Sequence, residues 1–392
     1  MPEPARDSWI AAFDGLRACA ALAVFGVHFQ QIAQFSPGNI GVFDIERALI
    51  NGNVGVSLFF TLSGFLLSIP FWRAKTGVAR QPAIDAYWVR RIVRIVPAYY
   101  LCLTALLVYN GALFDADEVT NVVMHYLFVF NYSNDYFYDF NPPFWTLAVE
   151  MQFYVLLPLL FLLVRRVSAA VAWLACAALA VVAYGVQSAL LQGVIGGELL
   201  AGAMMPNGAP GVVLTHSLLA HLPHFLFGVI AAGYQVVTRG RAAAGGQSRG
   251  AEVISVIAIA ATFALVGTDL GVSWSPPDAR YFWPLLSLAF AAVLLAAPRA
   301  ALVGGLLGSA PLRYAGRISY GFYLFHYPVM RLVEKLMDIP GTTPAAHPAG
   351  FALASLCLSI VIASASYFAL ERPLQRVGAR LARHRERGPR LP

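Results

Sequence analysis

Apolar stretches of about 20 residues follow one another along nearly the whole chain, from near residue 10 to near residue 370. A helix of that length crosses the hydrocarbon core of a bilayer. Only 12% of the 392 residues are charged and 59% are hydrophobic, whereas soluble domains carry about 25% charged residues. This pattern excludes a disordered chain, an ordinary soluble enzyme and a soluble domain with one membrane tail. It predicts an all-α polytopic membrane protein.

Ten segments are predicted to span the membrane, at residues 10–32, 52–71, 92–112, 144–164, 169–190, 218–238, 251–270, 281–297, 318–337 and 350–370. The apolar stretch 121–131 is too short to cross, so we expect a re-entrant or interfacial segment there. Residues 1–376 are expected to form a single transmembrane domain, and 377–392 a basic cytoplasmic tail without ordered structure. The Gly-rich segment 191–217 is expected to be a mobile cover.

The basic residues indicate the orientation of these spans. If the N-terminus is inside, 21 of the 27 Lys and Arg residues fall in cytoplasmic segments, 2 in external segments and 4 within spans. Cytoplasmic loops of membrane proteins are enriched in Lys and Arg, so both termini are predicted to be cytoplasmic. The net charge of +7 therefore reflects membrane topology and does not indicate nucleic-acid binding. The external stretch 113–143 holds five acidic and no basic residues.

The first span contains two polar residues that are expected to face the same way. Arg17 and His28 are eleven residues apart, which returns a helix to nearly the same direction and separates the residues by about 16 Å along its axis. Asp14 precedes Arg17 by three residues, on the neighbouring face. Charged groups inside a membrane are costly and are candidates for function. The alternative is an arginine that snorkels to the interface and a histidine that bonds a neighbouring helix.

Glu150 is the candidate partner of His28. It follows Pro142 and Pro143, which suit a helix start, and it would lie about 9 Å below the outer surface, with His28 at about 6 Å. The similar depths allow a hydrogen bond in which the carboxylate orients the imidazole as a general base. The alternative is that Glu150 pairs with another buried donor for structural reasons.

Two arginines of the third span form a candidate phosphate site. Arg91 and Arg94 are three residues apart and share a helix face, beside Arg90. Guanidinium groups are permanently charged and bind phosphate through two hydrogen bonds. The alternative is a topology anchor that contacts lipid headgroups.

Two further residues are candidates with a strong structural alternative. Ser63 lies among small residues that allow helices to approach closely, and it could line a cavity. His326 falls near the middle of the ninth span, where it is either a second ligand or acid–base group or the donor of a structural hydrogen bond. The histidines at 216, 221 and 224 lack an HExxH pattern and the four cysteines lack a CxxC pattern, so no metal is predicted.

Together, these motifs resemble the acyltransferase-3 family of integral membrane proteins over roughly residues 9–376. They are FDGLR followed by His28, GVSLFFTLSGFLLS, RRIVRIVP, FWTLAVEMQFY, SYGFYLFHYPV and ERPLQR, in that order. The resemblance implies an integral membrane enzyme that transfers an acyl group, commonly acetyl, from cytoplasmic acyl-coenzyme A to a hydroxyl group. The chain is expected to be a stand-alone member without the C-terminal SGNH hydrolase-like domain that many members carry.

The residues give this chemistry an expected arrangement. Arg17, Arg91 and Arg94 would hold the phosphates of acyl-coenzyme A, which is a co-substrate rather than a bound cofactor. His28, oriented by Glu150, would deprotonate the acceptor or carry the acyl group itself. Tyr154, Ser63 and His326 are candidate donors to the oxyanion, and Asp14 supports Arg17.

The expected acceptor is a carbohydrate, a glycolipid or a glycosylated small molecule, and the expected location is the cytoplasmic membrane of a bacterium, in contact with lipid. The sequence leaves open the acyl chain length, the side from which the acceptor enters and the oligomeric state. The alternative is a transporter or flippase that uses the buried Arg, His and Glu as a relay.

Overall fold

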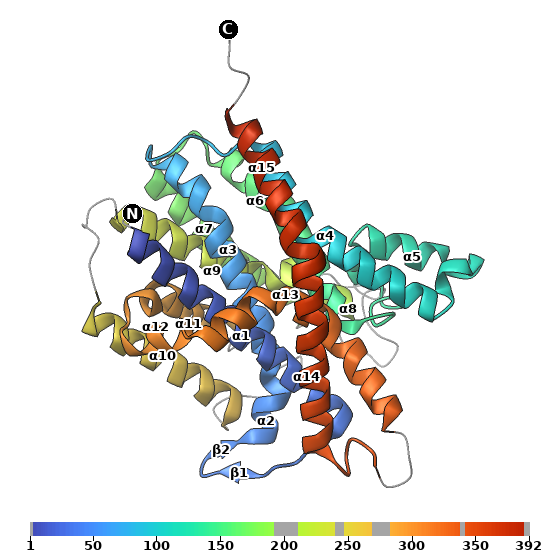
Figure 1. Ribbon diagram of the computed structural model, residues 1–392. Coiled ribbons are helices and arrows are strands. Elements are labelled where there is room, and N and C mark those ends of the chain that lie inside the picture. The colour runs from blue at the N-terminus through green and yellow to red at the C-terminus, as the bar shows by residue number, and fades with distance from the viewer. Residues whose placement is uncertain (1–2, 192–210, 240–246, 269–282, 338–341, 388–392) are drawn as a thin grey trace.

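The computed structural model describes residues 3–191, 211–239, 247–268, 283–337 and 342–387, and in these ranges the chain is almost entirely helical (Figure 1). The helices are α1 (Glu3–Ala33), α2 (Ile45–Ile50), α3 (Val54–Lys75), α4 (Ile84–Tyr109), α5 (Val119–Tyr126), α6 (Trp145–Leu163), α7 (Ala169–Leu191), α8 (Val212–Thr215), α9 (Leu218–Arg239), α10 (Arg249–Gly267), α11 (Trp283–Ala296), α12 (Leu302–Leu307), α13 (Ala310–Leu336), α14 (Pro348–Ser366) and α15 (Arg372–Arg387). Two short strands, β1 (Asn39–Ile40) and β2 (Phe43–Asp44), pair antiparallel.

The prediction of a polytopic helical membrane protein is confirmed. Within the described ranges, eight helical segments are long and apolar enough to cross a bilayer, at residues 11–33, 45–75, 84–109, 142–163, 169–190, 218–238, 249–267 and 348–386. They coincide with eight of the ten predicted spans. The other two predictions fall on α11, whose 14 residues are short for a span, and on α13, which is long but highly charged. α13 packs against α1 and α14, and its charged residues Arg317, Arg331 and Lys335 are exposed.

Close contacts between helices depend on glycine, as predicted for the second span. α3 packs along α9, and Gly64 of α3 lies against the carbonyl oxygen of Phe225. Gly228 of α9 lies in the same way against the carbonyl oxygen of Thr61, so a Cβ at either glycine would overlap the facing backbone. Small residues at such positions let helices in a membrane pack through their backbones. This crossing fixes the position of α3, which carries Ser63.

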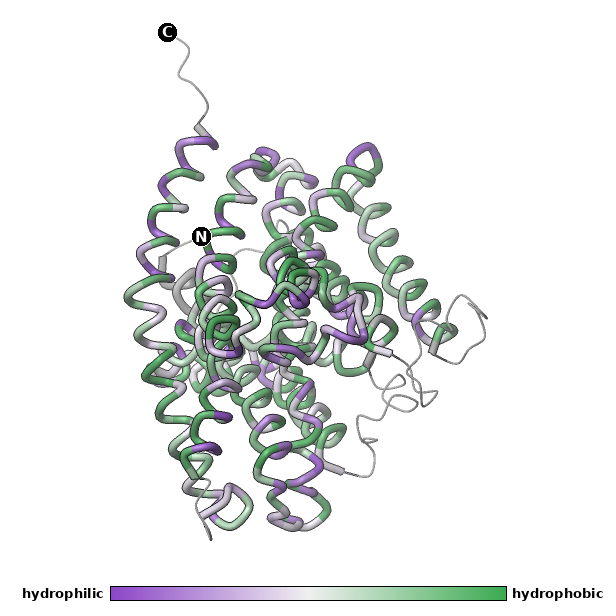
Figure 2. Tube along the Cα trace, turned by 90° about the vertical axis from the view of Figure 1, so that its right-hand side faces the viewer, coloured by the Kyte–Doolittle hydropathy of each residue, from purple (hydrophilic) through white to green (hydrophobic). Residues whose placement is uncertain are grey.

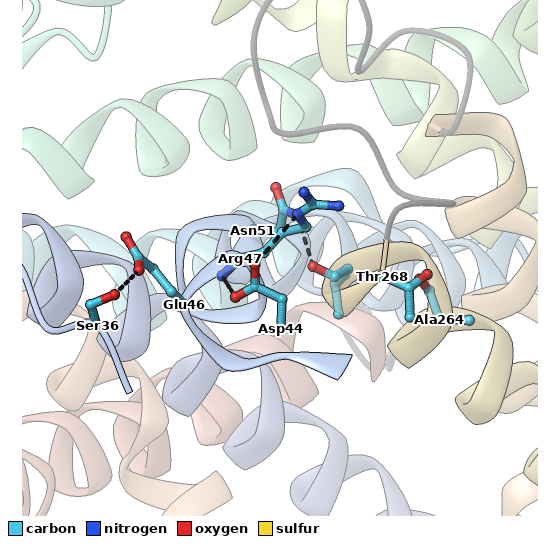
Figure 3. Close-up of polar contacts among 8 residues, drawn as sticks. Ser36, Asp44, Glu46, Arg47, Asn51, Ala264 and Thr268 are labelled. Atoms are coloured by element: carbon cyan, nitrogen blue, oxygen red, sulfur yellow. Dashed lines mark hydrogen bonds and ion pairs between the residues drawn. The ribbon is translucent and has the colours of Figure 1, made fainter. Parts of the chain in front are cut away.

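The two ends of the bundle differ. The β1–β2 hairpin and α2 lie at the lower end of Figure 1, which we call the hairpin end, whereas α15 lies at the upper end, which we call the tail end. At the hairpin end Asp44 caps α2 by accepting a hydrogen bond from the backbone N–H of Arg47 at 3.0 Å, and Ser36 donates to Glu46 at 2.5 Å (Figure 3). The side chain of Asn51 donates to the carbonyl oxygen of Val266 at 2.8 Å and ties this connection to α10.

The stretch 121–131 does not cross the bundle, as predicted. It forms the eight-residue helix α5 and a following turn. The imidazole of His125 stacks on Phe130 with 3.9 Å between ring centroids, and the hydroxyl of Tyr99 on α4 donates to the carbonyl oxygen of His125 at 3.0 Å. α5 is therefore anchored to the bundle through aromatic packing.

The prediction of a disordered tail is wrong for residues 377–387, which belong to α15. A π-helical turn at Tyr367–Glu371 joins α14 to α15, and α15 lies alongside α4. Gly378 and Ala382, four residues apart, are buried and let the two helices approach, while Arg90 pairs with Glu386 at 2.6 Å. Figure 2 shows α15 as alternating hydrophilic and hydrophobic turns, in contrast to the mainly hydrophobic bundle. Most of the Gly-rich segment, at 192–210, lies outside the described residues.

Candidate active site

A central cavity of about 90 Å³ lies between α1, α3, α4, α6 and α13. Six of the nine residues singled out in the sequence line it, although they come from four helices far apart in the chain: Arg17, Ser63, Arg91, Arg94, Glu150 and Tyr154. Asp14 adjoins this group through Arg17. The other two, His28 and His326, lie together nearby and are described below.

The carboxylate of Glu150 is held by two hydroxyl groups. Ser63 and Tyr154 each donate a hydrogen bond to Glu150 Oε1 at 2.7 Å. No hydrogen bond joins Glu150 to His28 in the described structure, so the predicted contact between them is absent. The depths derived from helix starts carried no information about which helices are neighbours. α6 packs against α3 and α9, whereas α1 packs against α3, α12 and α13.

The guanidinium groups give the cavity an excess of positive charge. Arg17 forms an ion pair with Asp14 at 2.8 Å, which confirms that these residues lie on adjoining faces. The Arg91 guanidinium lies over the Tyr154 ring, 5.9 Å from its centroid. Arg91 Nε is buried and has no hydrogen-bond partner among the described residues. Three guanidiniums against the carboxylates of Asp14 and Glu150 suit an anionic ligand.

Arg91 lies deeper than the sequence suggested. Helix α4 begins at Ile84, eight residues before the predicted start of the third span, so Arg91 and Arg94 lie about two and three turns into the helix rather than at its end. Tyr154, Tyr320 and Tyr323 of the facing helices line the same cavity as these arginines. Their position inside the bundle disfavours a role restricted to contact with lipid headgroups.

His28 has a different orienting partner from the one predicted. Its Nδ1 lies 2.9 Å from Oε1 of Gln31, one helical turn further along α1. An amide oxygen only accepts hydrogen bonds, so the proton resides on Nδ1 and the lone pair on Nε2. Gln31 was not among the predicted site residues, although its i, i+3 spacing from His28 was a usable signal.

His28 forms a pair with His326, with 5.2 Å between ring centroids. His326 is fully buried, and its Nδ1 donates to the carbonyl oxygen of Tyr323 at 2.8 Å. The predicted structural hydrogen bond of His326 is therefore present. Its Nε2 has no hydrogen-bond partner among the described residues, so both imidazoles offer an Nε2 lone pair.

The histidine pair lies between the central cavity and a second, wider opening. Tyr323 lines the central cavity, and its ring centroid is 5.7 Å from that of His326. Tyr327, one residue beyond His326, lines a cleft of about 950 Å³, which we call the wide cleft. The ring centroid of Tyr327 is 5.1 Å from that of His28. A continuous row of rings thus connects the two spaces through His28 and His326.

The predicted histidine group at 216–224 belongs to a separate buried network. His224 Nδ1 lies 2.5 Å from Ser287 Oγ and its Nε2 lies 3.3 Å from Ser57 Oγ. These serines bring α3 and α11 to α9. Among the described residues, no group of three or more His, Cys, Asp or Glu side chains is placed to hold a metal ion.

The fold and the site define a polytopic helical membrane protein with a buried, cation-rich polar cavity beside a histidine pair. The chain belongs to the acyltransferase-3 family, because the family model described as "Acyltransferase domain" matches residues 10–367. It is therefore an acyltransferase of the membrane, as the resemblance of its motifs predicted.

Curated relatives agree with this assignment. The chain is 28% identical to "Acyltransferase MdmB" of Streptomyces mycarofaciens, over 95% of this chain and 94% of the relative. It is 26% identical to "Peptidoglycan O-acetyltransferase OatA" of Listeria monocytogenes, over 94% of this chain and 56% of the relative. It is 27% identical to "Putative peptidoglycan O-acetyltransferase YrhL" of Bacillus subtilis, over 95% of this chain and 56% of the relative. No solved structure matches the chain significantly.

Proposed function

We propose that this membrane acyltransferase moves an acyl group, expected to be acetyl, from acyl-coenzyme A to a hydroxyl group of a carbohydrate or glycosylated acceptor. The observation that carries the proposal is the placement of His28 and His326 between a cationic cavity and a wide cleft. Two substrates that approach from opposite sides can then meet at one general base. The names of two relatives, which specify O-acetyl transfer to peptidoglycan, support the reaction class.

The donor is proposed to bind through the central cavity. Arg17, Arg91 and Arg94 would take the phosphates of the coenzyme at the tail end, which the distribution of basic residues assigns to the cytoplasm. Arg17 and His28 lie on one continuous helix, about 16 Å apart along its axis. That span is comparable to an extended pantetheine arm. If both termini are cytoplasmic, as the basic residues predict, the hairpin end faces away from the cytoplasm of a bacterial cell.

Donor binding requires the walls of the central cavity to separate. The cavity volume of about 90 Å³ is well below the roughly 300–1,000 Å³ of sites that enclose a small molecule. It would hold only a few water molecules, at about 30 Å³ of liquid each. The structure therefore corresponds to a closed state, and we expect the thioester arm to occupy the cavity only after α4 moves relative to α6 or α13.

The proposed reaction begins with proton transfer to His28. The acceptor hydroxyl gives its proton to Nε2 of His28, and the oxygen attacks the carbonyl carbon of the thioester. The carbon–sulfur bond then breaks, and the leaving thiolate takes the proton from the imidazolium. Gln31 holds the tautomer throughout. In the alternative relay, Nε2 of His28 attacks the thioester first and passes the acyl group to the acceptor.

The other candidate residues have more limited roles in this geometry. The hydroxyl hydrogens of Ser63 and Tyr154 are directed to Glu150, so neither is free to stabilise the oxyanion. His326 already donates through Nδ1 and offers an Nε2–H only as an imidazolium. Glu150 is proposed as a positioning residue, because it holds the Tyr154 ring on which the Arg91 guanidinium rests.

Thiol release from acetyl-coenzyme A by the purified protein in nanodiscs tests the proposal. We expect His28-dependent release that the His28→Ala variant loses, while His384→Ala, an exposed histidine on α15, keeps it. Loss in both variants, or retention in His28→Ala, would refute the role of His28. If the protein leaves acetyl-coenzyme A intact under all conditions and does not bind it, the transporter alternative is favoured.

A further inference from the structure

The wide cleft has the features of a substrate site, and none of the site residues predicted from the sequence lines it. It is formed where α1, α4 and α13 end, together with the loop 138–142 and residues 343–345. At about 950 Å³ it is about ten times larger than the central cavity, and it falls within the range of small-molecule sites, ~300–1,000 Å³. Its wall includes Tyr327, which contacts His28.

A proline on α13 helps to shape this cleft. Pro328 has no backbone N–H, so the carbonyl oxygen of Leu324, four residues earlier, lacks its helical partner. The side-chain amide of Asn141 donates to that oxygen at 3.0 Å. The bond holds the loop 138–142 against α13 beside Tyr327. The cleft wall is therefore built by a specific tertiary contact rather than by loose loop packing.

Exposed tyrosines line the cleft. Tyr109 at the end of α4 is 73% exposed and Tyr138 of the loop is 60% exposed. Their faces carry negative charge density, which attracts the C–H groups on one side of a pyranose ring. Together with Tyr327 they offer three rings in one opening, and Asn110 adds an amide that can bind hydroxyl groups.

The charged residues that line the cleft sum to one net positive charge. Arg331 and Lys335 line it with a single acidic residue, Glu334, which pairs with Arg331 at 2.5 Å. Lys335 contacts the hydroxyl of Tyr109 at 3.4 Å and forms no ion pair with a carboxylate among the described residues. Basic residues are scarce on this side, where 113–143 holds five acidic residues and no basic one. A lysine without a carboxylate partner among the described residues is not explained there by the rule that places basic residues inside.

We propose that the wide cleft binds the acceptor and that this acceptor is an acidic saccharide, whose sugar rings stack on the tyrosines and whose anionic group contacts Lys335. The proposal rests on the proposed function for the identity of the cleft as the acceptor side. It adds the location of the site and the charge of the substrate. A sugar that packs against Tyr327 would be separated from His28 only by the Tyr327 ring, whose centroid is 5.1 Å from that of His28.

Binding of two oligosaccharides in the absence of any donor tests the proposal. The probes are fluorescently labelled hyaluronan tetrasaccharide, with two carboxylates, and neutral chitotetraose, each measured by equilibrium dialysis against the protein in nanodiscs. We expect at least tenfold tighter binding of the hyaluronan probe. Lys335→Gln should remove most of that difference and leave chitotetraose within twofold. Arg47→Gln, which removes a cation of the hairpin end outside the cleft (Figure 3), should change neither.

A steric variant tests the location separately. Asn110→Trp places a large ring in the cleft at an exposed position and should abolish binding of both saccharides. Equal affinity for the two probes, an unchanged affinity in Lys335→Gln, or no binding of either probe would overturn the proposal. The binding assay contains no donor and is therefore independent of the thiol-release assay. If the saccharides bind but the protein releases no thiol from acetyl-coenzyme A in the separate assay, the cleft proposal stands and only the proposed transfer reaction is refuted.

Discussion

Replacing Gln31 with leucine is the sharpest test of how His28 is oriented. Among the described residues, Gln31 Oε1 accepts the one side-chain hydrogen bond of His28, at 2.9 Å. A neutral hydrogen bond of this kind contributes about 0.5–1.5 kcal/mol. If that contribution is lost in the transition state, the rate falls by a factor of about 2–13. We therefore expect Gln31→Leu to lower kcat by up to about tenfold and to leave the KM for acetyl-coenzyme A unchanged.

The assay is thiol release from acetyl-coenzyme A in nanodiscs, with the donor concentration varied. Gln30→Leu is the matched control on the same helix, because Gln30 is buried and its Oε1 has no hydrogen-bond partner within the described ranges. Its replacement by an apolar residue of similar size should preserve kcat. Glu150→Gln should mainly raise the KM for the donor. The reasoning is refuted if Gln31→Leu is fully active while Glu150→Gln is as inactive as His28→Ala, because Glu150 would then be the partner of His28.

Three further predictions test the donor site, the helix packing and the anchoring of α5. Arg91→Gln should raise the KM for acetyl-coenzyme A at least tenfold with a smaller change in kcat, and a loss confined to kcat in steady-state kinetics would contradict donor binding. Gly64→Leu should prevent recovery of a monodisperse protein by size-exclusion chromatography, because the added side chain meets the backbone of α9, whereas Gly185→Leu, with open space around it, should be recovered normally. Burial lowers the pKa of His125 from 6.5 to about 4, so the unfolded chain binds a proton more readily between these pH values, and stability should fall by up to about 3 kcal/mol as the pH drops from 6.5 to 4. His125→Phe should flatten this part of the pH dependence of the melting temperature, and an unchanged slope would show that other groups cause it.

The sequence predicted the helices well because their formation in a membrane is a local matter. Each backbone N–H and C=O in the hydrocarbon core must be satisfied within its own segment, so the length of an apolar stretch nearly determines the element. Predictions failed where the local pattern was polar. α15 looked like a solvated basic tail, but Gly378 and Ala382 allow it to dock on α4, and Glu386 pairs with Arg90 across nearly 300 residues of sequence.

The residues of the candidate site were predicted from the sequence, but the hydrogen bonds between them were not. Arg17, Arg91, Arg94 and Glu150 stood out because ionisable groups inside a membrane are costly, and the structure gathers them around one cavity. Depth along a helix follows from residue counting, which is why Glu150 and His28 were placed at similar depths. The side-by-side arrangement of helices does not follow from residue counting. This arrangement decides that Glu150 accepts hydrogen bonds from Ser63 and Tyr154 rather than from His28.

The sequence by itself thus determined the class of protein, the position of eight spans and the polar residues that enter the membrane, because hydrophobicity and charge act on each segment separately. Only the tertiary structure decided that His28 pairs with His326 and that this pair divides a cationic cavity from a wide cleft. Those outcomes depend on which helices pack through small residues and on single contacts such as that of Asn141 with Leu324. Such contacts join residues distant in sequence, so no local pattern encodes them.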